Sequence, residues 1–193
     1  MFLTRMALDI TRSATQQALT SPEIMNEAVR SAHYGENALW RIDQLRDRPY
    51  LLVLSRFRPA MWGIHEQLGI PGAFPSWESE CLDDALEALA RGDRLRFRLL
   101  AMPPEDAPPA HLKDWLISEG AACGFSLSAA DFDVLHVQRR ALPAATVTAD
   151  FAGVLTVLEP ERFASALQSG IGGGRRFGMG LMTLDAPGAH QRT

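Results

Sequence analysis

The segment from Gly170 to Gly180 constrains this chain more than any other feature of its sequence. It reads Gly-Ile-Gly-Gly-Gly-Arg-Arg-Phe-Gly-Met-Gly and lies between an expected helix, Pro160–Ser169, and an expected strand, Gly178–Leu184. A Rossmann loop leads from a strand into a helix and a Walker loop carries a lysine, so this segment fits neither nucleotide-binding pattern. Two interpretations stay open. The loop either binds an anion through its backbone N–H groups and arginines, or is a flexible turn with two solvated arginines.

The first hundred residues are predicted to form six elements in the order βαββαβ. The first helix is the best defined, because Ser21 is a suitable N-cap, Pro22 suits the first helical position and apolar residues follow at helical spacing. The expected elements are a strand 2–10, a helix from 21 to about 35, strands 38–42 and 50–57 that pair as a hairpin, a helix 82–89 and a strand 94–101. Residues 58–80, rich in Pro and Gly, are expected to be a long irregular connection. This order is the ferredoxin-like arrangement, which is also the fold of the RRM module.

The second half of the chain is predicted to repeat that arrangement. Residues 103–110 are rich in proline and acid and are expected to be a linker between an N-terminal domain, 1–102, and a C-terminal domain, 111–193. The C-terminal domain is expected to hold a helix 111–119, strands 125–127, 133–141 and 147–157, a helix 160–169 and a closing strand 178–184, with its first helix and strand degenerate. The predicted fold class is therefore α+β, with two tandem ferredoxin-like (RRM-like) domains and antiparallel sheets.

The charges are distributed unevenly along the chain. A formal net charge of −4, from 19 basic and 23 acidic residues, argues against a protein that coats nucleic acid through bulk positive charge. Lys113 is the only lysine, and arginine suits bidentate contacts with phosphate and guanine. Six acids and no Arg or Lys lie between residues 61 and 90, whereas Arg91–Arg98 carries four arginines and one acid. A net-negative chain can thus hold a localised basic cleft.

Cysteine and histidine usage gives no indication of a metal site. Cys81 and Cys123 lie far apart, and the five histidines form no ligand pattern with them, so we expect no structural zinc, no metal cofactor and no disulfide framework. No signal peptide is evident, and no apolar run approaches the ~20 residues needed to cross a bilayer. The expectation is a reduced, cytoplasmic, soluble protein with no membrane association.

Several short segments carry a resemblance to a known family. They are Phe151–Val157 followed by a helix, the glycine-rich loop and Leu181–Leu184; the opening strand Met1–Arg5; the basic strand Gly92–Leu99; Leu39–Arg41; and Trp115-Leu116. In this order they resemble the CasE family, the CRISPR-associated endoribonucleases and hairpin-binding subunits of type I-E Cascade.

The resemblance implies a function in CRISPR RNA processing and antiviral defence. It implies two ferredoxin-like domains that bind the hairpin of a CRISPR repeat RNA and cut at the stem base without metal, by attack of the RNA's own 2′-hydroxyl on the adjacent phosphate. Such chemistry needs a base, an acid and positive donors for the pentacovalent phosphate. It also implies that the protein stays bound to its product and joins the backbone subunits of the effector complex at the hairpin end.

The resemblance places the family's catalytic histidine in the first helix, at a position held here by Asn26. Asparagine is no base near neutral pH, although its amide can donate to a phosphate oxygen. Asn26, Arg30 and His33 stand at i, i+4 and i+7, on one face of that helix, and are the candidate catalytic residues. His33 lies roughly 10 Å along the helix from Asn26, and it is also a typical helix-terminal histidine that interacts with the dipole.

The candidate RNA-binding residues are mainly arginines. Three of them alternate on one face of the strand 94–101 with apolar residues on the other, a pattern that favours an anion-binding face over a solvated one. Two more stand before a short loop where relatives carry a basic hairpin that enters the major groove of the RNA. The whole set is Gly172, Gly173, Gly174, Arg175 and Arg176 near the scissile or 3′ phosphate, Arg94, Arg96 and Arg98, Arg139 and Arg140, and Arg12.

Three functional hypotheses follow. The first is an endoribonuclease with a modified active site, in type I-E Cascade or in a related effector such as a type IV complex. The second is a subunit that caps the hairpin of a guide RNA without cutting it, because Asn26 replaces the histidine. The third is a ferredoxin-like protein with no CRISPR role, which the ordered run of resembling segments disfavours.

Overall fold

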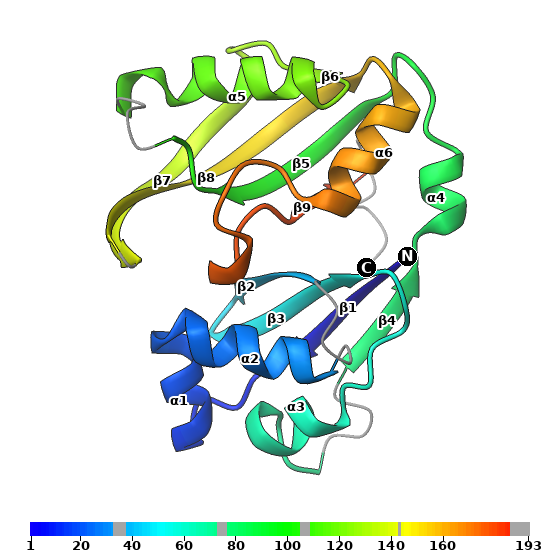
Figure 1. The fold of residues 1–193 in the computed structure, drawn as a ribbon. Helices are drawn as coiled ribbons and strands as arrows, with labels where there is room; N and C mark the ends of the chain where they lie inside the picture. The colour runs from blue at the N-terminus through cyan, green and yellow to red at the C-terminus, as the bar shows by residue number, and fades with distance from the viewer. Residues whose placement is uncertain (33–37, 73–76, 105–108, 143, 186–193) are drawn as a thin grey trace. The chain divides into compact units, whose positions relative to one another are not determined.

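The computed structural model describes residues 1–32, 38–72, 77–104, 109–142 and 144–185. The chain divides into two units by its internal contacts. Unit 1 comprises Met1–Ala85 and the short segment Arg175–Gly178, and unit 2 comprises Leu86–Gly174 and Met179 onward. Both units mix helices with an antiparallel sheet (Figure 1).

Unit 1 is a complete βαββαβ arrangement. Its sheet has the strand order β2-β3-β1-β4, which is the ferredoxin-like order, and every pairing is antiparallel. Its elements are β1 (Phe2–Ala7), α1 (Ser13–Thr20), α2 (Pro22–Ala32), β2 (Leu39–Leu45), β3 (Arg48–Ser55), α3 (Trp62–Leu68) and β4 (Trp77–Cys81), followed by α4 (Asp83–Glu87) at the boundary of the unit. The predicted hairpin of β2 and β3 and the helix that begins at Pro22 are confirmed. The helix α1 is an addition that the sequence pattern does not predict.

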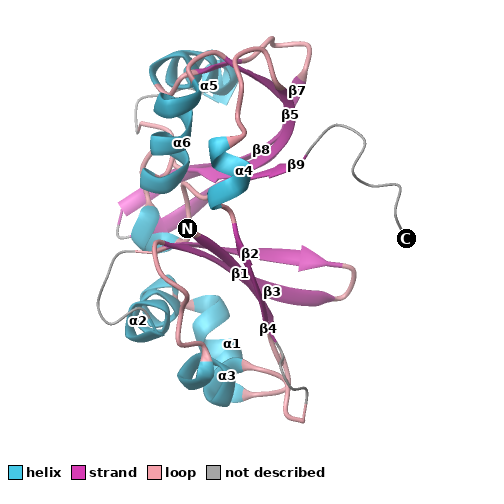
Figure 2. Cartoon of the chain, turned by 90° about the vertical axis from the view of Figure 1, so that its right-hand side faces the viewer, coloured by secondary structure: helices cyan, strands magenta, loops and turns pink. Residues whose placement is uncertain are grey.

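The core of unit 1 lies on one face of this sheet. Alternate strand residues such as Met6, Leu51 and Val53 are fully buried, and they pack against Met25 and Val29 of α2. Figure 2 shows α1, α2 and α3 together on that side of the strands. The apolar residues of α2 therefore face the sheet, and its other side is left for polar side chains.

The fourth strand of unit 1 is β4, in a segment that was expected to be an irregular connection. That expectation is wrong, because β4 pairs with β1 over its whole length, with Trp77 opposite Met6 and Cys81 opposite Phe2. It is an edge strand whose Glu78 and Glu80 are exposed, so it lacks the apolar alternation of a central strand. The helix before it, α3, lies among the prolines and glycines that pointed to a loop.

Unit 2 repeats the arrangement. Its sheet has the order β6-β8-β5-β9, and β7 pairs with the same edge of β8 as β6, further along that strand. The two strands β6 and β7 thus take the place of one, and the order is again ferredoxin-like. The elements are β5 (Arg94–Ala101), the 3₁₀ turn η1 (Pro109–His111), α5 (Leu112–Ala122), β6 (Phe125–Ser126), β7 (Phe132–Leu142), β8 (Ala144–Val157), α6 (Pro160–Ser169), the 3₁₀ turn η2 (Arg175–Phe177, counted with unit 1) and β9 (Met182–Asp185).

The position of β5 corrects the predicted domain boundary. The strand was expected to close the N-terminal domain at residue 102, but it pairs with β8 on one side and β9 on the other, in the middle of the second sheet. The sequence of β5 suits either sheet, and only its distant partners decide between them. The second half is therefore not degenerate, and Met102, which forms a bridge with Gly173, belongs to unit 2 rather than to the N-terminal domain.

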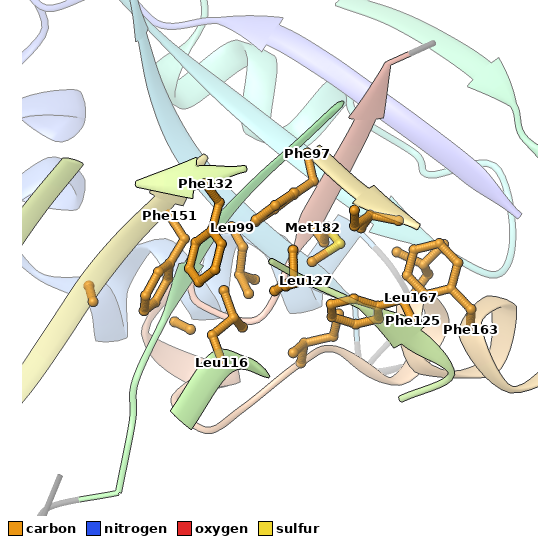
Figure 3. Packing of buried hydrophobic residues seen from close by; sticks show 14 of the residues in the cluster. Phe97, Leu99, Leu116, Phe125, Leu127, Phe132, Phe151, Phe163, Leu167 and Met182 are labelled. Carbon is orange, nitrogen blue, oxygen red and sulfur yellow. The ribbon is translucent and has the colours of Figure 1, made fainter. Parts of the chain in front are cut away.

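Aromatic and aliphatic side chains fill the core of unit 2. Phe97, Leu99 and Phe151 from the sheet meet Leu116 of α5 and Phe163 of α6, and all five are buried. Figure 3 shows these side chains interdigitating with Phe125, Phe132 and Met182. Phe125 and Phe163 pack with ring centroids 5.2 Å apart, which ties β6 to α6.

The helices are short. The longest, α2 and α5, have 11 residues each, and no helix within the described ranges is both long and apolar enough to span a membrane.

Candidate functional site

The helix α2 carries two of the three candidate catalytic residues. Its Met25, Val29 and Ala32 face the core, while Asn26 is half-buried beside this stripe and Arg30 is exposed one turn further on. Arg30 makes an exposed ion pair with Glu27 at 3.4 Å. Asn26 and Arg30 thus share one face, as predicted. His33 lies outside the described residues.

Asn26 is held by a tryptophan of the neighbouring strand. The indole Nε1–H of Trp40, on β2, donates a hydrogen bond to Oδ1 of Asn26 at 3.1 Å. Trp40 is 3% exposed, and a buried indole N–H needs such an acceptor. Because an indole nitrogen only donates, this bond fixes the orientation of the amide. The oxygen of Asn26 faces Trp40, and its NH₂ group is left to donate to another acceptor.

The turn η2 packs against α2 and β2, although well over a hundred residues separate them in sequence. Phe177 is buried, whereas Arg175 and Arg176 are exposed. The guanidinium of Arg176 lies over the Phe177 ring, 4.6 Å from its centroid. Two exposed arginines from the end of the chain therefore join Asn26 and Arg30 within one unit.

Gly178 allows this packing. Its φ is +80°, and a Cβ there would lie 2.6 Å from Cζ3 of Trp40, so only glycine fits. Trp40 therefore contacts both Asn26 and the backbone that carries the arginines. Sequence reasoning missed this role, and the usable signal was a tryptophan inside a predicted strand, whose indole N–H needs an acceptor when it is buried.

The glycines before the arginines contact the protein itself. A Cβ on Gly172 would lie 3.2 Å from the Trp115 ring, and one on Gly174 would lie 2.9 Å from the sulfur of Met179. The N–H of Gly173 donates to the carbonyl of Met102 at 3.3 Å. These contacts account for small residues at 172–174 by packing, and the binding of RNA by this stretch stays a prediction.

The arginines of β5 alternate with buried residues as predicted. Phe97 and Leu99 point into the core, and Arg94, Arg96 and Arg98 point to the other face. Each has a carboxylate nearby from another segment: Arg98 binds Asp150 at 2.8 Å, Arg94 lies 3.6 Å from Asp131, and Arg96 stands opposite Asp185 in the register of β9. This row is therefore partly neutralised, which the strand's own sequence does not reveal.

The remaining candidates lie elsewhere. Arg12 donates to the backbone carbonyl of Glu66 and lies 3.7 Å from Asp9, so its guanidinium fastens the start of α1 to the end of α3. The hydroxyl and backbone N–H of Thr11 both donate to Asp9 and lower the pKa of its carboxyl, which keeps that partner charged. Arg139 is exposed on the β7–β8 hairpin, and the side chain of Arg140 lies outside the described residues.

Comparison with known proteins identifies a family and a relative that this chain resembles in sequence. The model of a family described as CRISPR associated protein matches residues 1–186. The CRISPR-associated endoribonuclease Cse3 of Thermus thermophilus is 27% identical, over 95% of this chain and 99% of that protein.

Two solved structures extend the likeness to the fold. The crystal structure of a CRISPR-associated protein from Thermus thermophilus superimposes with a TM-score of 0.82 at 27% identity, covering 96% of this chain and 100% of the other. Thermus thermophilus Cse3 bound to an RNA representing a pre-cleavage complex gives 0.80 at 25% identity, covering 95% and 98%. The resemblance to the CasE family is thereby confirmed.

Proposed function

Because the chain belongs to the family of CRISPR associated proteins, we propose that it binds the hairpin of a CRISPR repeat RNA and processes the precursor by cutting at the base of the stem. The observation that carries this proposal is the meeting of η2 with α2, which puts Arg175 and Arg176 in the same unit as Asn26 and Arg30. Three exposed guanidinium groups suit a phosphate whose charge rises during the reaction.

The proposed reaction is an internal phosphoryl transfer. The 2′-oxygen of one nucleotide loses its proton and bonds to the adjacent phosphorus, and the bond from phosphorus to the 5′-oxygen of the next nucleotide breaks. That oxygen takes up a proton, so the products are a 2′,3′-cyclic phosphate and a free 5′-hydroxyl. Arg30, Arg175 and Arg176 would stabilise the pentacovalent phosphate, and the NH₂ group of Asn26 would donate to one of its oxygens.

A second candidate function is hairpin binding without cleavage. It is favoured by the hydrogen bond from Trp40 to Asn26, because the amide oxygen is already an acceptor for the indole N–H and an amide takes up no proton near neutral pH. In this case the same arginines hold a guide RNA that another enzyme has cut.

In either case we expect the protein to stay on the RNA as the hairpin-end subunit of a cytoplasmic effector complex, in contact with its backbone subunits. The protein would stay on its product if it contacts the RNA stem, because cleavage at the stem base leaves the stem intact.

One experiment separates the two candidates. The purified protein is incubated in EDTA with its cognate repeat RNA, and with the same RNA carrying a 2′-deoxy nucleotide before the scissile phosphate. Cleavage of the first RNA to a cyclic phosphate and a 5′-hydroxyl, with binding but no cleavage of the second, supports processing. Tight binding of both without cleavage selects the capping function, and loss of hairpin binding altogether overturns the proposal.

The arginines of η2 are tested by salt dependence. We expect Arg175→Ala with Arg176→Ala to weaken hairpin binding and to reduce the slope of log Kd against log salt by about 2, one for each phosphate contact. The matched control is Arg48→Ala with Arg162→Ala, which removes two exposed arginines at the start of β3 and on α6. Equal slopes for the two double variants would show that η2 does not contact the RNA backbone.

A further inference from the structure

A pocket of about 300 Å³ opens in unit 2 beside the glycine-rich loop. Ligand pockets span about 300–1,000 Å³, so this one suits a group the size of a single nucleobase rather than a dinucleotide. Its walls come from Met102 and the two prolines that follow β5, from Trp115 and Glu119 of α5, from Thr146 near the start of β8, and from Gly172 and Gly173 of the loop.

The walls combine a flat aromatic ring with apolar side chains. Trp115 and Glu119 stand one turn apart on α5, so both point from the same helix face. The loop backbone at Gly172 lies against the edge of the Trp115 ring, and on another side this ring packs with Phe151 at 5.9 Å between centroids. A ring held in this way is a suitable platform on which a base stacks.

The polar groups of the pocket indicate which nucleobase would fit it. The Glu119 carboxylate only accepts hydrogen bonds and repels a phosphate, so the pocket selects a ligand edge that donates. Guanine presents two parallel donors, N1–H and the N2 amine, which match the two oxygens of a carboxylate. Adenine and cytosine present one amine each, and uracil presents one N–H between two carbonyls. The hydroxyl of Thr146, which is 5% exposed, is a further donor or acceptor in the wall.

We propose that this pocket binds an unpaired guanine of the RNA, stacked on Trp115 and hydrogen-bonded to Glu119. The inference rests on the proposed function, which supplies the RNA. Gly172 and Gly173 stand directly before Gly174-Arg175-Arg176 in the chain, so one loop supplies a wall of the base pocket and the charges for the RNA backbone. Reading a base that has left the stack in a snug pocket is a general way to add sequence selectivity to phosphate contacts.

The first test needs no hairpin. In full-length protein labelled at methionine methyl groups, the Met102 resonance is followed while GMP, AMP, CMP or UMP is added. We expect GMP to bind about tenfold or more tightly than the other nucleotides, the discrimination typical of one bidentate pair. Glu119→Gln should remove this preference. The control, Glu161→Gln, removes the same charge from an exposed position on α6 and should keep it.

The second test uses RNA. The cognate repeat hairpin is given an oligouridine tail, either uniform or with one guanosine, and Kd is measured for the three proteins. The proposal predicts about tenfold tighter binding of the guanosine tail by the wild type and by Glu161→Gln, and equal binding of both tails by Glu119→Gln. Equal binding of both tails by the wild type, with no Met102 shift from GMP, overturns the pocket and leaves the hairpin function standing. A GMP-specific shift without hairpin binding supports the pocket and overturns the proposed function.

Discussion

The bond between Trp40 and Asn26 decides what Asn26 offers a ligand. Because the indole N–H donates, the amide oxygen is turned to Trp40, and the amide hydrogens are what remains for an anion. The residue is thereby suited to bind a phosphate oxygen rather than to take up a proton. Sequence spacing located Asn26 and Arg30 on one face, but the partner that orients the amide is 14 residues away on a strand and could not be read from spacing.

Replacing Trp40 by phenylalanine tests this bond. The change removes the donor and leaves an amide oxygen beside an apolar ring, so we expect the free energy of unfolding to fall by about 1–3 kcal/mol. Urea unfolding measures it. Trp62→Phe is the control, since Trp62 is exposed, and should change stability by less than about 0.5 kcal/mol. Similar losses in both variants would show that the hydrogen bond contributes nothing beyond ring size.

The two cysteines should differ in reactivity. Burial, with the negative charge of Glu119 as a second cause, raises the pKa of the Cys123 thiol above its ordinary value of 9.0. Cys81 is exposed. At pH 8 we expect iodoacetamide to alkylate Cys81 well before Cys123, and urea to abolish the difference, with mass spectrometry as the measurement.

The raised pKa of Cys123 also makes the stability of the folded protein depend on pH. Because folding raises the pKa of Cys123, its contribution to stability is fully present below pH 9.0 and is lost as the pH rises through the higher folded-state value. Faster labelling of Cys123 than of Cys81 in the folded protein would contradict the burial of the Cys123 thiol.

At the scale of elements, η2 depends on one glycine. Gly178 and Gly72 both have positive φ, but only Gly178 faces a buried ring, whereas a Cβ on Gly72 would meet open space. We expect Gly72→Ala to cost about 1 kcal/mol for its backbone conformation and Gly178→Ala to cost about 1–3 kcal/mol more, because Trp40 cannot move aside. Thermal and urea unfolding of the pair measure the difference. If the two variants are equally stable, Trp40 does not hold η2.

The ion pairs of β5 allow a second matched comparison. Asp150 is 15% exposed and binds Arg98 through both of its oxygens, whereas Asp131 and Arg94 are exposed and 3.6 Å apart. We expect Asp150→Asn to lower the free energy of unfolding by about 1 kcal/mol and Asp131→Asn by less than about 0.5 kcal/mol. The reverse order would mean that the shorter, less exposed pair is not the stronger one.

Local patterns predicted most helices and strands and the pairing of one hairpin, but not the pairing of strands that lie far apart in the sequence. The hairpin of β2 and β3 follows from two adjacent apolar runs, and α6 from its proline and terminal glycine. By contrast, β4 was not predicted because its exposed glutamates remove the apolar alternation typical of a strand. The pairing of β5 was not predicted because its partner strands lie far later in the chain. The predicted βαββαβ order of unit 1 was right, although its last helix and strand are α3 and β4 rather than the next helix and β5. Pairing across such distances depends on the whole sheet, which no short window contains.

At the scale of the whole molecule, β5 decides where the chain can be divided. A fragment 86–193 keeps β5 between β8 and β9, whereas a fragment 103–193 loses it and leaves β9 without the strand it pairs with. We expect the first fragment to show a strand-rich circular dichroism spectrum and a cooperative urea transition, and the second to be unfolded. Cooperative unfolding of 103–193 would instead restore the boundary at residue 102.

The return of Arg175–Gly178 to unit 1 also sets an order of events during synthesis. The strands and helices of this unit are complete once Cys81 has left the ribosome, but η2 follows about 90 residues later, which takes about 5–20 s at ordinary elongation rates. A nascent chain therefore contains the strands of unit 1 before Arg175 and Arg176, which η2 places against α2, have been synthesised. Under the proposed function, a product that ends before Arg175 contains the sheet of unit 1 but lacks the two cations expected to contact the RNA backbone.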